Sequence, residues 1–126
     1  MATQSIEQSA AFLAGADVAQ ENLGGGIARQ ILGHGPDLMV VRVAFEAGSV
    51  GAVHAHPHSQ STYVESGRFE VVIDGETRVL GAGDGFYVAP HLDHGAVCLE
   101  AGVLIDTFSP ARSEEHTSEL QSPLDI

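Results

Sequence analysis

Three histidines stand at positions from which their side chains can meet on one metal ion. His54 and His56 are two residues apart in the segment VHAHP, and this spacing on a strand puts both imidazoles on the same face. His94 follows forty residues later in the segment PHLDH, and a barrel can bring it opposite the first pair. Imidazole ligands suit Zn, Ni, Fe, Co and Mn, so the sequence predicts one divalent metal ion without choosing among them.

One acidic residue lies in an otherwise apolar run near the end of the chain. Asp106 is flanked by the run VLI and by Thr107 and Phe108, and two-residue parity puts Asp106 and Phe108 on one face. If that face is the interior, the carboxylate lies near the metal, where it can donate or accept a proton. The alternatives are a buried Asp satisfied by backbone N–H groups, or the opposite parity with Asp106 in solvent.

Other polar or reactive residues have weaker patterns. His58 and His91 have the wrong parity or spacing for metal ligands, and each either lines the mouth of the pocket or has no role there. His34, between two glycines, is expected in a loop. Asp84 is expected in a turn rather than on a metal, and Cys98 is expected to pack within a strand.

The composition excludes several classes of protein. The net charge is −12 and the chain has no lysine, so an acidic surface would repel nucleic acid and anionic membranes. The missing lysine also excludes Schiff-base chemistry and a P-loop. The single cysteine cannot form an intramolecular disulfide. No apolar run approaches the roughly 18 residues of a membrane span, and the N-terminus lacks the basic start of a secretory signal. A cytoplasmic protein is expected.

The elements that must position these residues are short strands. Apolar and β-branched runs indicate strands, which are separated by glycine-containing turns at 66–67, 74–75, 81–84 and 101–102. The expected strands cover residues 38–45, 50–56, 61–65, 69–73, 77–80, 85–89 and 96–108. Residues 1 to about 15 are polar and alanine-rich and can form a short helix or stay frayed. The predicted fold class is all-β, a two-sheet antiparallel jelly-roll barrel of about one domain's length.

Two segments together resemble the conserved motifs of the cupins. The first cupin motif, G-x5-H-x-H-x3-E-x6-G, matches at Gly48, His54, His56 and Gly67, with Gln60 where many cupins have Glu. The second, a glycine- and aspartate-containing segment that ends in P-x3-H, matches residues 83–94. The resemblance implies a double-stranded β-helix whose metal is held by His54, His56, Gln60 and His94. These four ligands are neutral, so the ion would keep its full charge and favour an anionic substrate oxygen.

A closer resemblance is to the pectin-degradation cupins of the KdgF type. It is carried by H-x-H-P-H-S-Q-x-T-Y-V-x-S-G, P-H-L-x-H-G-A and D-T-F-S-P-x-R. That family opens 4,5-unsaturated monouronates to linear 5-keto-4-deoxyuronates. The resemblance implies an acidic sugar as the substrate, a homodimer, and substrate roles for Asp106, Phe108 and Arg112. Arg42 is the next candidate for binding the substrate carboxylate if Arg112 does not.

Two other functions remain open on the sequence. A three-histidine iron cupin dioxygenase would use the same ligands, although the neutral Gln60 and the D-T-F-S-P-x-R segment argue mildly against it. A non-catalytic cupin that binds a sugar or a small acid is the second alternative.

The end of the chain departs from this pattern. The sequence of residues 112–122, RSEEHTSELQS, matches the in-frame translation of a common sequencing adapter. We therefore expect residues 1–112 to form the cupin domain and residues 113–126 to be a non-native tail on a gene fragment from environmental DNA. His116 is then not functional, and Arg112 is both a plausible last native residue and the first adapter codon. The alternative is a native polar tail.

Overall fold

The computed structural model describes residues 8–111, and Arg112 and the segment 113–126 lie outside this range. Its described part contains strands, turns and one short 3-10 helix, η2, at Gly15–Asp17. The strands are β1 (Glu21–Gly24), β2 (Ile27–Gly35), β3 (Leu38–Phe45), β4 (Val50–His54), β5 (Ser59–Ile73), β6 (Glu76–Gly81), β7 (Gly85–Val88) and β8 (His94–Ser109).

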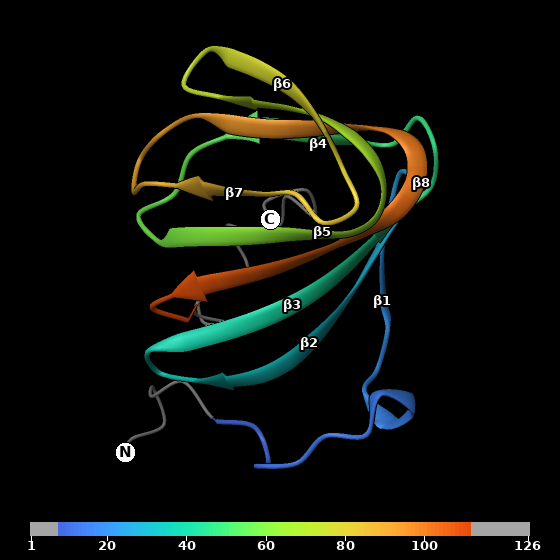
Figure 1. Cartoon of the computed structure of the whole chain (residues 1–126). Helices are drawn as coiled ribbons and strands as arrows, with labels where there is room; N and C mark the ends of the chain where they lie inside the picture. The colour runs from blue at the N-terminus through green and yellow to red at the C-terminus, as the bar shows by residue number, and fades with distance from the viewer. Residues whose placement is uncertain (1–7, 112–126) are drawn as a thin grey trace.

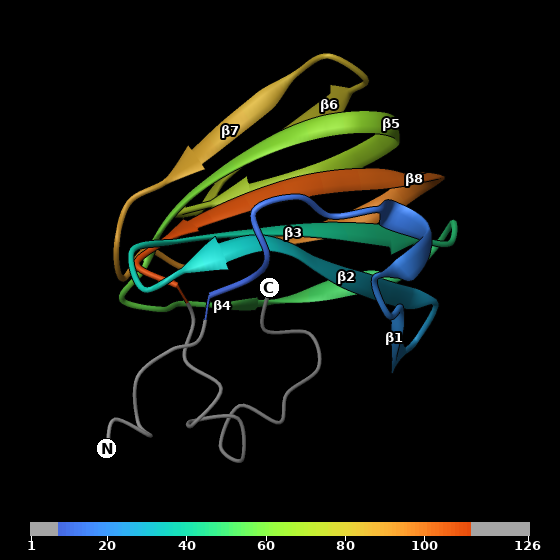
Figure 2. The same ribbon diagram turned by 90° about the horizontal axis from the view of Figure 1, so that it is seen from below.

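The strands form two antiparallel layers because β5 and β8 are long enough to belong to both. The first part of β5 pairs with β7 and its last part with β6. The first part of β8 pairs with β4 and its last part with β3, which continues through β2 to β1. Figure 1 shows the two long strands curving from one layer into the other, and Figure 2 shows the same layers from below. The all-β jelly-roll prediction is confirmed.

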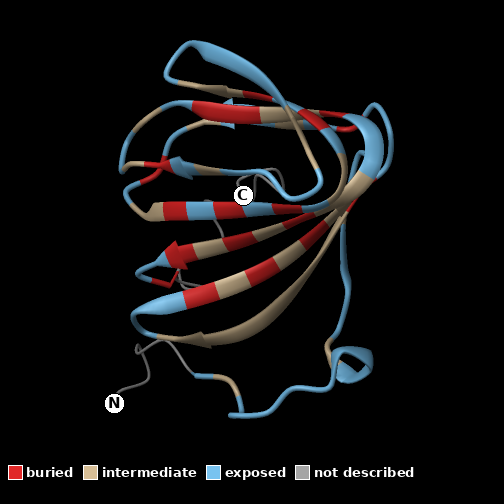
Figure 3. Cartoon of the chain, viewed as in Figure 1, coloured by how far each residue is buried: buried red, intermediate tan, exposed pale blue. Residues whose placement is uncertain are grey.

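The interior between the layers is apolar and follows the alternation of the strands. In β3, Met39, Val41, Val43 and Phe45 are buried, while the residues between them are not. They pack in one cluster with inward residues of β5 and β8, including Phe69. Figure 3 shows the resulting alternation of buried and more exposed positions along these strands. The walls of the barrel are therefore fixed by close packing.

The structure corrects the expected break at Ser66 and Gly67. These residues lie inside one continuous strand, β5, where the pairing register with β8 shifts. Gly67 has a φ of +85°, and a Cβ there would lie 2.6 Å from the carbonyl oxygen of Glu100. Gly67 thus marks a β-bulge where two paired strands approach closely, rather than a turn between two strands. Ala101 and Gly102, whose pair resembles a turn, lie within the continuous strand β8, in agreement with the strand expected at 96–108.

The N-terminal third of the chain also differs from the prediction. Strands β1 and β2 were not expected, and His34 lies in β2 rather than in a loop. Among residues 8–15, the structure has irregular backbone up to the start of η2 in place of the possible helix. Residues 1–7 lie outside the described range.

Candidate metal centre

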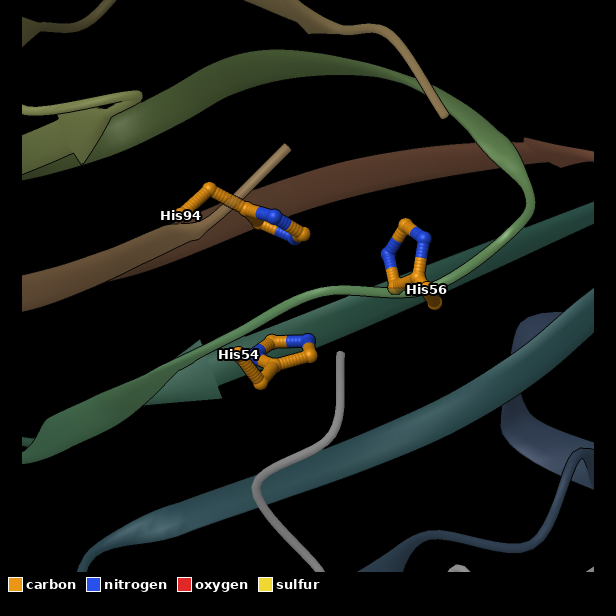
Figure 4. A group of neighbouring side chains, drawn as sticks. All are labelled: His54, His56 and His94. Atoms are coloured by element: carbon orange, nitrogen blue, oxygen red, sulfur yellow. The ribbon is translucent and has the colours of Figure 1, made fainter. Parts of the chain in front are cut away.

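Strand pairing brings the three predicted histidines together. His54 ends β4 and lies directly opposite His94, which begins β8. His56 follows two residues after His54 in the connection to β5. One ring nitrogen from each of the three lies within 4.8 Å of the others. Figure 4 shows the imidazole rings grouped around one space. Three histidines in this arrangement can hold a metal ion.

Backbone carbonyl groups orient all three rings in the same way. Each Nδ1 atom bonds a carbonyl oxygen two residues away, at 2.9 Å for His54 to Ala52, 3.1 Å for His56 to His58 and 3.0 Å for His94 to Leu92. A carbonyl oxygen can only accept, so each Nδ1 carries the hydrogen. In the neutral ring, Nε2 then offers a lone pair. This is the support that metal-binding imidazoles usually have.

The amide of Gln60 lies next to the histidines with its oxygen toward them. Gln60 Oε1 is 3.0 Å from His56 Nε2, and both atoms offer lone pairs when His56 is neutral. Two such atoms repel unless a cation or a second proton on His56 lies between them. Two ligands at a right angle on one ion, with bonds of about 2.1 Å, are themselves about 3.0 Å apart. The donor set therefore fits a metal ion, and ligation by Gln60 stays a prediction.

Asp106 lies inside the barrel beside Gln60. Its side chain thus faces the interior and not the solvent. Its side chain is 3% exposed. Its Oδ1 accepts hydrogen bonds from the Thr62 hydroxyl at 2.6 Å and, more weakly, from Gln60 Nε2 at 3.4 Å. Side-chain donors, rather than only backbone N–H groups, thus stabilise the carboxylate. A small cavity of about 30 Å³ lies beside Gln60, His94 and Asp106.

Thr62 is a site residue that the sequence analysis missed. It is buried, and it lies directly across from Asp106 in the pairing of β5 with β8. The signal was its position two residues after Gln60 on a strand, which puts both side chains on one face. Without the pairing register, the position shows no link to Asp106.

Phe108, His58 and His91 support the centre from its edge. The Phe108 ring is fully buried and lies edge-on to His56, with 5.8 Å between ring centroids. The His58 carbonyl holds the His56 ring, while its own imidazole is half-buried 5.5 Å from that of His56. His91 has an exposed side chain and a φ of +70°, and its backbone N–H donates to the His56 carbonyl at 2.7 Å. His58 and His91 thus act on His56 through their backbone.

No arginine of the described residues lies at the centre. Arg42 points away from the core and lies 3.7 Å from Glu65, so the structure does not favour it as the group that binds a substrate carboxylate. Arg29, Arg68 and Arg78 also pair with glutamates. Arg112 lies outside the described residues, and its role stays a prediction.

The remaining expectations concern residues away from the centre. Asp84 caps a turn, where its Oδ2 accepts the Gly81 N–H at 2.8 Å, as expected. Cys98 is buried in β8, and this burial raises the pKa of its thiol. Within residues 8–111, no helix has the length and apolar character required to cross a membrane.

The fold and the paired motifs define a class of protein. The Cupin domain family matches residues 41–108, which contain every described residue of the centre, and the chain belongs to this family.

Within the cupins, the chain belongs with those of the KdgF type. It is 50% identical over 96 residues to the pectin degradation protein KdgF of Dickeya dadantii, a match that covers 75% of this chain and 87% of the relative. The crystal structure of an RmlC-like cupin from Shewanella frigidimarina has a TM-score of 0.84 and 52% identity, covering 87% of this chain and 99% of the other. KdgF from Halomonas sp. has a TM-score of 0.80 and 42% identity, with coverage of 85% and 99%.

Proposed function

We propose that this protein is a metal-dependent enzyme of pectin degradation that converts 4,5-unsaturated monouronates into linear 5-keto-4-deoxyuronates. The observation that carries the proposal is the position of Asp106. This buried carboxylate lies 3.4 Å from the Gln60 amide, whose oxygen is 3.0 Å from His56. A group that can move a proton thus adjoins the candidate metal ligands, in a chain half identical to a pectin degradation protein.

The proposed ligands are Nε2 of His54, His56 and His94 and Oε1 of Gln60. A bound divalent ion supplies a Lewis acid that stabilises negative charge on substrate oxygens. All four protein ligands are neutral, so they leave the charge of the ion undiminished. This suits an acidic sugar as the substrate.

The reaction requires one proton to change place without loss or gain of atoms. As the anomeric hydroxyl loses its proton, the bond from C1 to the ring oxygen breaks and leaves an enolate at C5, which becomes a ketone when C4 gains the proton. Asp106 takes up and returns this proton. Phe108 packs edge-on against the His56 ring and shapes the pocket from behind it. Arg112 binds the substrate carboxylate with two parallel hydrogen bonds.

The test follows the loss of ultraviolet absorbance of the conjugated double bond in a 4,5-unsaturated monouronate. We expect metal-loaded protein to accelerate the loss and Asp106→Asn to lower kcat about 100-fold or more, the usual contribution of a general acid or base. The control is Asp84→Asn, which alters an exposed turn and should retain activity. Decay at the spontaneous rate with metal-loaded wild-type protein would refute the proposal.

Oxygen uptake separates this reaction from the dioxygenase alternative. We expect Fe(II)-loaded protein to convert the uronate without consuming oxygen. Oxygen consumption without uronate conversion would favour the dioxygenase, and saturable uronate binding without either reaction would favour the binding protein.

A further inference from the structure

Thr62 lies between the two halves of the candidate site. Its hydroxyl oxygen accepts a hydrogen bond from Gln60 Nε2 at 2.9 Å, and its hydroxyl hydrogen points to Asp106 Oδ1 at 2.6 Å. Thr62 and Gln60 are each 2% exposed, so bulk solvent does not compete for these bonds. Gln60, Thr62 and Asp106 therefore form a closed hydrogen-bond triangle, completed by the Gln60 to Asp106 contact at 3.4 Å.

The triangle fixes which end of the Gln60 amide faces the histidines. The hydroxyl has one hydrogen, and the close carboxylate takes it, so Thr62 can only accept from Gln60. If the amide turned over, its oxygen would face the Thr62 oxygen and the Asp106 carboxylate, neither of which could donate to it. The turned amide would donate its N–H to His56 Nε2 instead, and would then present no oxygen to a metal ion. The orientation observed is the one that presents a metal-binding oxygen to the centre.

We propose that Thr62 is a positioning residue that sets the direction of the Gln60 amide and thereby determines metal affinity. Because this inference rests on the proposed metal site, it deepens the proposed function. It does not depend on the identity of the substrate. Thr62 touches neither the ion nor the reacting atoms, and it acts through Gln60 and Asp106.

The experiment measures Zn²⁺ affinity by competition with a chromophoric chelator, and the visible spectrum of the Co²⁺-loaded protein. Thr62→Val keeps the shape and the branched Cβ but removes the hydroxyl. We expect it to weaken Zn²⁺ binding about 10- to 100-fold, as is usual when a supporting hydrogen bond to a ligand is lost, and to change the Co²⁺ spectrum. Thr62→Ser restores the hydroxyl and should stay within about 3-fold of wild type.

Two controls separate positioning from a general loss of structure. Thr77→Val makes the same substitution at an exposed position of β6 and should leave affinity and spectrum unchanged. Thermal unfolding of the metal-free proteins shows whether Thr62→Val folds, and Thr62→Ala replaces it if it does not.

Wild-type affinity and an unchanged Co²⁺ spectrum in the folded hydroxyl-free variant would overturn the inference. So would a loss of affinity in Thr62→Ser as large as that in Thr62→Val. These readouts need no substrate. A protein that binds metal in a Thr62-dependent way but converts no uronate would keep this inference and reject the proposed reaction.

Discussion

At the scale of single residues, the neighbours of Gln60 explain why an amide stands where many cupins have a carboxylate. The amide oxygen lies toward His56, and the amide NH₂ group donates hydrogen bonds to Thr62 and Asp106. A glutamate could place an oxygen beside His56, but its other oxygen would lie against the carboxylate of Asp106. Only an amide offers an acceptor on one side and a donor on the other.

We therefore predict that Gln60→Glu uncouples metal binding from activity. The carboxylate oxygen can still hold an ion, but Asp106 loses a donor and gains a repulsive neighbour, which costs about 1.5–3 kcal/mol for a bond to a charged group. We expect a kcat at least 10-fold lower with one metal ion still bound. Metal analysis and uronate turnover on the same sample check this. Undiminished turnover in the variant would show that the amide N–H is dispensable.

The Cys98 thiol makes the free energy of unfolding depend on pH in the alkaline range. Burial raises its pKa above the ordinary value, so the unfolded chain releases the proton at a lower pH than the folded chain. Stability from this residue is fully present below about pH 8.5. It falls as pH rises toward the folded pKa, by up to about 1.4 kcal/mol per pH unit.

Guanidinium unfolding at pH 7–10 measures this effect. We expect the free energy of unfolding to fall more steeply in wild type than in Cys98→Ala over the upper part of the range. Equal pH dependence in the two proteins would mean that Cys98 makes no contribution.

At the scale of elements, the site depends on the pairing of β5, which carries Gln60 and Thr62, with β8, which carries Asp106 and His94. Near the bend the two backbones approach so closely that only glycine fits. A Cβ on Gly102 would lie 2.1 Å from the Ser66 carbonyl oxygen and 2.6 Å from the Gly67 Cα. These contacts are with backbone atoms and cannot be relieved by rotating a side chain.

Gly102→Ala is therefore expected to lower the free energy of unfolding by about 3 kcal/mol, the upper end of the cost of inserting a methyl group into a packed site. Gly15→Ala is the matched control, because a Cβ there meets nothing within 4 Å. It should change stability by less than about 0.5 kcal/mol. Chemical unfolding of both variants checks the difference. Equal free energies of unfolding in the two variants would contradict the close approach of the two backbones at Gly102.

Predictability from the sequence followed the strength of local patterns. The run at Leu38–Phe45 is apolar and β-branched, and its strand has the bounds expected. The H-x-H spacing and Asp106 were found because strand parity and an acid in an apolar run are local signals. Strands β1 and β2 were missed because their sequences, ENLG and IARQILGHG, contain glycine and little alternation. Thr62 needed the register between β5 and β8, which no local pattern encodes.

At the scale of the whole molecule, the layers hold the centre inside while the exterior stays acidic. Each arginine of the described residues pairs with a glutamate on the surface, away from the candidate centre. The expected homodimer stays a prediction. Light scattering after gel filtration should give twice the 13.1 kDa chain mass, and a mass of one chain would contradict it.

The most direct test of a metal-dependent uronate-converting enzyme compares bound metal with product formation in the same samples. Protein is stripped of metal, reloaded in steps with one divalent metal, and analysed for metal content and for linear 5-keto-4-deoxyuronate by nuclear magnetic resonance. The account predicts a rate that rises in proportion to bound metal, from the spontaneous rate at zero to a maximum at one ion per chain. A product rate that is independent of metal content would contradict it.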